Sequence, residues 1–228
     1  MFIVLLADPI HNAMTKRLQS NIALPPHAPF LAENATPAAA ATYTCLDMRL
    51  FIGIPLAASV IEELEKVSMR HRVEGDGLRW STPESWHITL QFLGKTSETQ
   101  YVCVVARLRN LRSAPLPIEL DDLGFFDRAG IFFAGVTLTP ELLALQQMVT
   151  ASTIPCGFVP EDRPYRPHIT LARAKGRRNA TGLETLKAKI RHQPKFSQFV
   201  AEEFLLYESL THPTGSQYET RERFRLGF

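Results

Sequence analysis

The chain has 228 residues, a formal net charge of +2 and 45% hydrophobic residues, the profile of an ordinary globular protein. That length fits one large domain or two small lobes with an ample core. The small net charge excludes a protein that wraps nucleic acid through bulk positive charge, so an anionic substrate would need local cations. The sequence contains no run of about 18 apolar residues, the minimum for a transmembrane helix.

Three cysteines, Cys45, Cys103 and Cys156, lie far apart and form no Cys-x-x-Cys pair. An odd number without that spacing argues against a disulfide framework and against a zinc site. From this pattern we expect a reducing cytoplasmic location and no bound metal.

Residues 1–47 differ from the rest of the chain. They contain five prolines and a run of alanines, and they keep no amphipathic period. The apolar start, 1–7, is short and has no basic residue before it, unlike a secretory signal. We expect a flexible leader, or a translated stretch upstream of a start at Met48, with His11 and His27 as bystanders. Residues 48–228 are then a single bilobal domain.

From Met48 the pattern is that of a folded domain. β-branched and aromatic residues predict a strand over 49–56, and apolar residues at helical spacing predict a helix over 57–70. A short extended stretch at 78–80 and a strand over 86–93 follow. Ser97, with Gln100 three residues on, is a capping box that predicts the next helix, whose apolar stripe runs to Leu111.

The second half repeats this order. Residues 116–126 and 131–138 are predicted strands joined by a turn at 127–130. Thr139 and Pro140 predict the start of a helix over 139–152, and a proline-rich loop at 155–167 leads to a strand over 167–173. A basic loop at 175–178, a helix at 183–190 and strands at 204–207 and 218–226 complete the chain.

Two strand–helix–strand units therefore match. The first is 49–56, 57–70 and 86–93, and the second is 131–138, 139–152 and 167–173. This repetition predicts an internal duplication. We expect an α+β fold of two lobes related by a pseudo-twofold, with antiparallel sheets flanking a central cleft and helices outside.

The motif His-Ile-Thr-Leu occurs in the last strand of each unit, at 87–90 and at 168–171. Alternate residues of a strand share a face, so His87 projects with Thr89, and His168 with Thr170. A single histidine in a strand is usually only a satisfied polar residue. Repetition at matching positions favours a functional pair.

Two imidazoles flanking one substrate suit acid–base catalysis, because one can accept a proton while the other donates one. A phosphodiester fits, since it offers an oxygen leaving group and an electrophile for in-line attack. Thr89 and Thr170 could each donate a hydrogen bond to a phosphate oxygen. The scheme requires no metal, and no glycine-rich loop indicates ATP.

Two residues five positions after the histidines complete the predicted site. Arg173 could contact the phosphate, and Phe92 could stack a nucleobase. The competing interpretations are that Phe92 belongs to the core and that Arg173 is a solvated charge at a strand end. The basic loop at 175–178 is either a solvated loop or a contact for a polyanionic substrate.

These motifs resemble the 2H phosphoesterase superfamily, and within it the bacterial RNA 2′,3′-cyclic phosphodiesterases, also called 2′-5′ RNA ligases. The resemblance spans Met48 to the C-terminus and rests on the paired motifs together with 49–52, 79–80, 92–94, 166–173 and the closing Ser209, Gly215 and Tyr218. Two features depart from the family: the 47-residue leader, and Trp86, where a smaller aliphatic residue is usual. We expect Trp86 to point away from the cleft.

The resemblance implies metal-free hydrolysis of RNA 2′,3′-cyclic phosphate ends to 2′-phosphates. In that scheme His168 is the base that activates water and His87 is the acid that protonates the leaving 3′ oxygen. It also implies weak, reversible joining of RNA ends through a 2′-5′ bond. RNA ends are then the partners, and we expect no cofactor, no membrane association and a monomer.

Two alternatives stay open at this stage. The chain could be a phosphodiesterase for 2′-5′ oligonucleotides or small cyclic nucleotides, which a narrower cleft would favour. It could also be a non-catalytic RNA-binding module. The intact His87, Thr89, His168 and Thr170 argue against the second alternative, because binding alone needs no pair of titrating imidazoles.

Overall fold

The computed structural model describes residues 48–176, 180–212 and 215–227. All of them fall within the compact unit Tyr43–Phe228. The predicted leader at 1–47, Arg177 and Arg178 of the predicted basic loop, and Pro213 and Thr214 between the closing strands lie outside the described residues.

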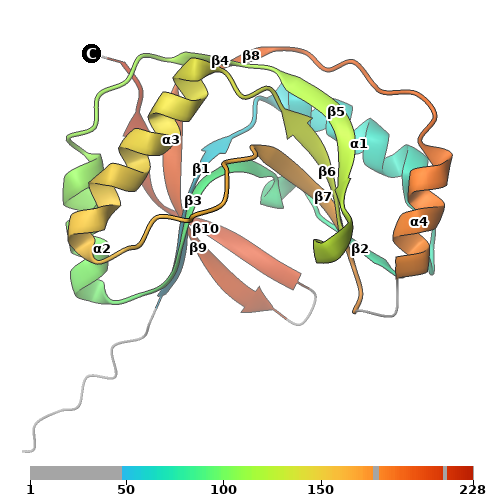
Figure 1. Cartoon of the computed structure of the whole chain (residues 1–228), viewed down its shortest axis with the longest axis horizontal. Coiled ribbons are helices and arrows are strands. Elements are labelled where there is room, and N and C mark those ends of the chain that lie inside the picture. The colour runs from blue at the N-terminus through green and yellow to red at the C-terminus, as the bar shows by residue number, and fades with distance from the viewer. Residues whose placement is uncertain (1–47, 177–179, 213–214, 228) are drawn as a thin grey trace, which may run out of the picture. The chain divides into compact units, whose positions relative to one another are not determined.

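Two four-stranded antiparallel sheets form the centre of this unit (Figure 1). Sheet A has the strand order β10-β9-β1-β3, and sheet B has the order β2-β7-β6-β5. The strands of sheet A are β1 (Met48–Pro55), β3 (His87–Thr96), β9 (Glu203–His212) and β10 (Gly215–Arg225). Those of sheet B are β2 (Leu78–Trp80), β5 (Leu120–Phe126), β6 (Ile131–Val136) and β7 (His168–Ala174). A two-stranded sheet pairs β4 (Leu116–Ile118) with β8 (Phe199–Ala201).

The α-helices begin where the capping signals predict. Ser97 and Gln100 form a complete capping box before α2 (Glu98–Leu108), and Thr139 caps α3 (Pro140–Thr153) with proline in the first turn. The others are α1 (Ala58–His71) and α4 (Ala180–Lys189), with short 3₁₀ turns at Pro83–Ser85, Asp127–Ala129 and Ile154–Cys156.

The predicted duplication is present in the fold. β1 pairs with β3 in sheet A, and β6 pairs with β7 in sheet B, each antiparallel. The sequence pattern does not reveal that the helix of each unit packs against the sheet of the other unit. α3, which follows β6, contacts β3 of the other unit through Gln146 Nε2, which donates to Leu90 O at 3.5 Å. α1, which follows β1, lies beside sheet B, where Val67 and Leu123 of β5 line one cavity (Figure 1).

One predicted strand is divided. Residues 116–126 do not form a continuous strand, because β4 pairs with β8 in the small sheet and only β5 joins sheet B. β8 had no counterpart among the predicted elements, since its pairing with β4 bridges a long sequence separation. The closing strands are also longer than predicted, because β9 and β10 pair from Glu203↔Arg225 to His212↔Gly215.

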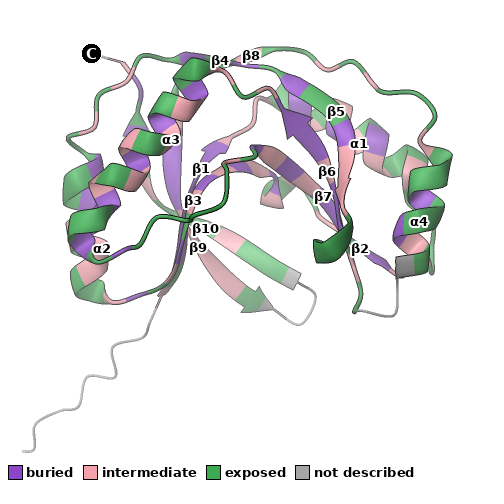
Figure 2. Cartoon of the chain, viewed as in Figure 1, coloured by how far each residue is buried: buried purple, intermediate pink, exposed green. Residues whose placement is uncertain are grey.

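The apolar residues predicted to face inward form a continuous core beneath both sheets (Figure 2). Ile88 and Ile169, the second residues of the two repeated motifs, are 0% exposed. Trp86 is 5% exposed and belongs to the same core, so it points inward as expected. Burial of the isoleucines on one face leaves the neighbouring histidines and threonines on the other.

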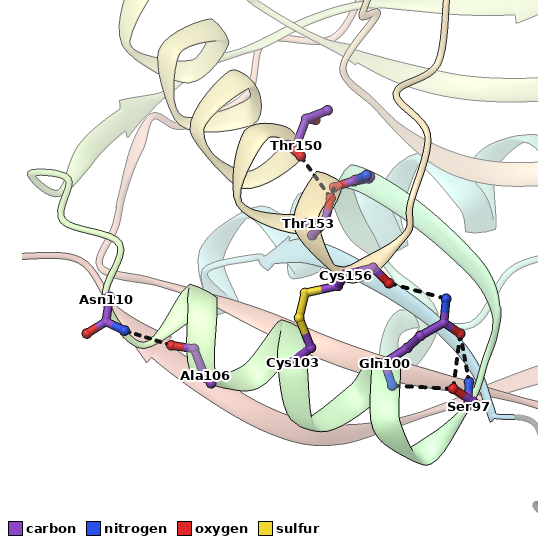
Figure 3. The surroundings of a disulfide bond; sticks show 9 residues. Ser97, Gln100, Cys103, Ala106, Asn110, Thr150, Thr153 and Cys156 are labelled. Atoms are coloured by element: carbon purple, nitrogen blue, oxygen red, sulfur yellow. Dashed lines mark hydrogen bonds between the residues drawn. A yellow bond between two sulfur atoms is a disulfide. The ribbon is translucent and has the colours of Figure 1, made fainter. Parts of the chain in front are cut away.

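The cysteine interpretation was wrong. Cys103 of α2 and Cys156, in the 3₁₀ turn after α3, form a disulfide, with a Cα–Cα distance of 5.7 Å (Figure 3). The two residues are 53 positions apart in sequence, and only the packing of α2 against α3 brings them together. The cysteine pattern therefore gives no support to a reducing compartment.

Candidate active site

His87 is the first residue of β3, and its ring is fixed from both sides. Its Nδ1 lies 2.9 Å from Ser85 O, an acceptor, so the ring carries a proton on Nδ1. Phe51 packs against the imidazole with ring centroids 4.5 Å apart, and Tyr218 meets it edge-on at 5.2 Å. Within the described chain, Nε2 has no hydrogen-bond partner, so it is the nitrogen available to a substrate.

His168 is the first residue of β7 and repeats this arrangement. Its Nδ1 lies 2.8 Å from Arg166 O, again the carbonyl two residues earlier. Phe126 and Phe133 meet the ring edge-on at centroid distances of 4.9 and 5.5 Å. Nε2 of this ring is likewise unpartnered among the described residues. The two histidines therefore share one tautomer and one mode of support.

Matching β-bulges shape the two histidine strands. In sheet A, Gly53 is opposite Thr89 while the preceding Ile52 is opposite Gln91, so Leu90 is the extra residue. In sheet B, Phe133 is opposite Thr170 while Phe132 is opposite Ala172. Leu171 is therefore the extra residue there, and the leucine of each repeated motif forms a bulge.

The bulges decide which side chains join the histidines. In a regular strand, a residue five positions after a histidine lies on the opposite face. One extra residue reverses that parity, so Phe92 and Arg173 return to the face of His87 and His168. Exposure agrees: Phe92 is 67% exposed and Arg173 is exposed, whereas Ala172 is 0% exposed. We call these two surfaces the histidine faces of sheets A and B.

The histidine faces belong to one site. β3 and β7 are in contact, and Tyr165 Oη, from the loop before β7, donates to Thr89 O at 2.9 Å. The charge of His168 also contributes to lowering the pKa of His87, after the larger effect of burial. Thr89 and Thr170, which follow their histidines by two residues, are partly exposed on the same faces.

Arg173 acts on both imidazoles. Its charge lowers the pKa of His87 and of His168, so the guanidinium lies within electrostatic reach of each. Arg79 of β2 is the cross-strand partner of Arg173, and the two like charges lie side by side at the edge of sheet B. In the part of the chain that the structure describes, neither arginine forms a salt bridge, so the pair favours an anionic ligand.

Burial dominates the protonation of the pair. Desolvation lowers the pKa of His87 to about 4, against the raising effect of the hydrogen bond to Ser85. Desolvation also lowers the pKa of His168, with Arg173 and Arg166 adding to the effect. Both imidazoles are therefore neutral near pH 7 in the free protein. Burial raises the pKa of Tyr207 to about 12, so this phenol beside His87 stays protonated.

Sequence reasoning missed the aromatic residues that hold the rings. Phe51 of β1 and Phe133 of β6 each pack on the histidine of their own sheet, from different register positions: Phe51 is opposite Phe92, and Phe133 is opposite Thr170. The local match of Phe51-Ile52-Gly53-Ile54 with Phe133-Ala134-Gly135-Val136 gives no usable signal, because the strand register places Gly53 and Phe133 at the equivalent positions. Gly53 is needed here, since a Cβ would approach Ile88 O to 2.9 Å and His87 Cδ2 to 3.3 Å.

Among the described residues, no group of three or more His, Cys, Asp or Glu side chains is arranged to hold a metal ion. Their helices also include none that is long and apolar enough to cross a membrane.

The geometry is that of a two-histidine phosphoesterase, and comparison with known proteins identifies the family. The family model of the 2′-5′ RNA ligase superfamily matches residues 55–213. The chain belongs to the 2′-5′ RNA ligase superfamily.

Similar curated proteins are named RNA 2′,3′-cyclic phosphodiesterase. The protein of Aeropyrum pernix is 38% identical over 107 residues, covering 45% of this chain and 61% of that protein. The protein of Aquifex aeolicus is 28% identical over 187 residues, which covers 79% of this chain and 98% of that protein. The Escherichia coli protein is 27% identical over 180 residues, covering 78% and 96% of the two chains.

Solved structures show the same fold. E. coli LigT in complex with 3′-AMP matches with a TM-score of 0.68 and 26% identity, covering 79% of this chain and 98% of that one. TT0787 of Thermus thermophilus matches with a TM-score of 0.66 at the same identity, covering 78% and 98%. The resemblance seen in the sequence is thus confirmed at the level of the family and the fold.

Proposed function

We propose that this protein hydrolyses 2′,3′-cyclic phosphate ends of RNA to 2′-phosphomonoesters without a metal or cofactor. The observation that supports this most strongly is the matched pair of imidazoles. His87 and His168 are each fixed through Nδ1 and each keep Nε2 for a substrate. The names of the curated relatives support RNA as the substrate.

In the proposed reaction, His168 Nε2 accepts a proton from a water molecule as the water oxygen attacks phosphorus. The bond from phosphorus to the 3′ oxygen breaks, and His87 Nε2–H donates its proton to that oxygen. The product carries a 2′-phosphate and a free 3′-hydroxyl, and the proton then on His168 returns to solvent. The division of roles follows the family resemblance. With an RNA 5′-hydroxyl involved in place of water, the same steps would form or break a 2′-5′ bond.

The other residues of the histidine faces would hold the phosphate and the base. Thr89 and Thr170 can donate hydrogen bonds to the two non-bridging oxygens, and Arg173 can neutralise their charge. Phe92 presents an exposed ring next to Phe51, which itself packs on His87, and a nucleobase could stack on it.

The low pKa of His87 fits an acid that is charged only when substrate is bound. In the free protein its pKa is about 4, because the ring is desolvated and faces positive neighbours. An anionic phosphate between the histidines would raise the pKa of both imidazoles. Substrate binding would thereby load the proton that the leaving oxygen requires. A cytoplasmic, monomeric enzyme is part of the same proposal.

Turnover of an oligonucleotide with a 2′,3′-cyclic phosphate end, measured in excess EDTA, tests this function. We expect the parent protein to release a 2′-phosphate and the variants His87→Ala and His168→Ala to lose at least about 10²-fold in kcat. An inert parent, or variants as active as the parent, would reject the two-histidine mechanism. RNA binding without turnover would then become the leading interpretation.

A further inference from the structure

Two cavities lie beside α1 and α4 and are not formed by the histidine pair. One, of about 400 Å³, lies between the turn that follows α1 and the helix α4. The other, of about 210 Å³, lies between α1 and residues 192–196. His71 lines both cavities, and we call the two together the outer groove.

The outer groove is rich in cations where α1 faces residues 192–196. Lys66, Arg70 and Lys195 line this part and are exposed, as is His192. Within the described chain, none of these three cations forms a salt bridge. Their charge is therefore available to an external anion.

The single carboxylate that lines this part of the groove is already engaged. Glu63 accepts hydrogen bonds from Ser197 N at 2.8 Å and from Ser197 Oγ at 2.7 Å. In the larger cavity, the carboxylate of Asp76 accepts from Leu78 N at 2.7 Å and from Trp80 Nε1 at 2.8 Å. Glu74 is the other acid there. The acids thus reduce but do not cancel the positive charge at Lys66, Arg70 and Lys195.

The electrostatics of His71 agree with a positive field. Burial lowers the pKa of His71, and the charges of Arg70 and Lys189 lower it further. Arg70 and Lys189 therefore lie close enough to His71 to disfavour its protonated form.

The outer groove is connected to the histidine face of sheet B through β2. Arg79 is paired with Arg173, and the next residue toward the groove, Leu78, lines the larger cavity. Lys175 N also donates to Gly77 O at 2.9 Å, so the end of β7 meets the rim of that cavity. β2 is an edge strand, so a chain leaving Arg173 can pass Arg79 and round that edge toward α1 (Figure 1).

We propose that the outer groove, through Lys66, Arg70 and Lys195, binds the phosphodiester backbone of the same RNA strand whose end lies between the histidines. This inference rests on the proposed function. A flexible single strand suits the groove because its phosphates recur along the chain and can meet separated cations in turn. The groove would then distinguish an RNA end from a free cyclic nucleotide.

Kinetics on two substrate lengths test the proposal. The triple variant Lys66→Ala/Arg70→Ala/Lys195→Ala should hydrolyse a dinucleotide with a cyclic phosphate end at the parent's rate. Its kcat/KM on a single strand of about 20 nucleotides should fall on the order of tenfold or more at low salt. The matched control Arg107→Ala/Arg109→Ala/Arg112→Ala removes the same charge from exposed positions on α2 and just after it. It should leave both rates unchanged. Equal losses on both lengths, or equal losses in both variants, would overturn the proposal.

A binding measurement separates failure of the groove from failure of the function. Fluorescence anisotropy with a single strand ending in a 2′-phosphate requires no turnover. If the groove holds three phosphates, the slope of log affinity against log salt should become shallower by about 2 in the triple variant. A parent that is inert on both substrates but shows this change would reject the function and keep the groove. An unchanged slope would reject the groove, whatever the activity.

Discussion

Phe92 and Arg173 occupy equivalent positions in the two halves of the protein. Each follows its histidine by five residues, and each reaches the histidine face because a leucine, Leu90 or Leu171, is the extra residue of a β-bulge. The two halves thus share a backbone but present different chemistry: an aromatic ring beside His87 and a guanidinium beside His168. Under the proposed function, this symmetric frame would hold an asymmetric ligand, with the base on one side and the phosphate charge on the other.

Phe92→Ala should weaken binding without weakening the fold. The ring is 67% exposed, so its removal costs little stability, whereas loss of base stacking costs about 1–3 kcal/mol. We expect KM for a cyclic-phosphate dinucleotide to rise roughly 5- to 100-fold and the melting temperature to stay the same. Val102→Ala, at a 57% exposed position on α2, is the matched control. If Phe92→Ala leaves KM unchanged, the ring does not stack a base.

Arg173→Ala should change both turnover and protonation. Loss of a phosphate contact is expected to lower kcat/KM on the order of 10²-fold. The charge of Arg173 lowers the pKa of both histidines, so its removal should raise both. NMR titration of the imidazole protons would detect this rise. Arg173→Lys keeps the charge and should keep the pKa values near those of the parent. Unchanged titration in Arg173→Ala would place the guanidinium away from the pair.

The sequence pattern was sufficient to predict the duplication and the pair of histidines, because both depend on local periodicity and on a repeated motif. The bulges were not predictable in this way. Under strict alternation, Phe92 and Arg173 would lie on the buried face with Ile88 and Ile169. The pairing registers of the two sheets, together with the exposure of both side chains, show that they do not.

Long-range packing explains the other differences. Helix α1 lies on the sheet of the second unit, and α3 contacts the sheet of the first. Helical spacing alone does not say which sheet a helix covers. The Cys103–Cys156 disulfide depends on the same placement of α3, because Cys156 follows α3 and Cys103 lies on α2. Counting cysteines therefore gave the wrong result, although each helix was predicted close to its observed bounds.

Protein stability should fall as the pH is lowered from 7.5 to 5. His87 has a folded-state pKa of about 4 against an ordinary value of 6.5. Below pH 6.5 the unfolded chain takes up a proton that the folded protein does not, so the stability present above pH 6.5 is lost progressively. From these two values the loss at pH 5 is about 2 kcal/mol.

Urea unfolding of the parent and of His87→Gln at both pH values measures this contribution. The glutamine cannot titrate, so the variant should lose about 2 kcal/mol less than the parent between pH 7.5 and 5. The lowered pKa of His168 acts in the same direction and remains in both proteins. Equal losses in the parent and the variant would show that His87 is not desolvated in the folded protein.

Removal of the disulfide should destabilise the link between α2 and α3. The bond closes a loop of 53 residues, and loop-closure entropy of that size corresponds to roughly 4 kcal/mol. We expect the double variant Cys103→Ser/Cys156→Ser to unfold at a lower temperature than the parent and to be insensitive to reductant. Reductant should lower the melting temperature of the parent and of the control Cys45→Ser alike.

Because Gln100 Nε2 also donates to Cys156 O at 3.4 Å, the loop that leads to His168 keeps one attachment to α2 after reduction (Figure 3). Activity should therefore fall less steeply than stability, and a reduced protein that is as stable as the oxidised one would contradict the bond.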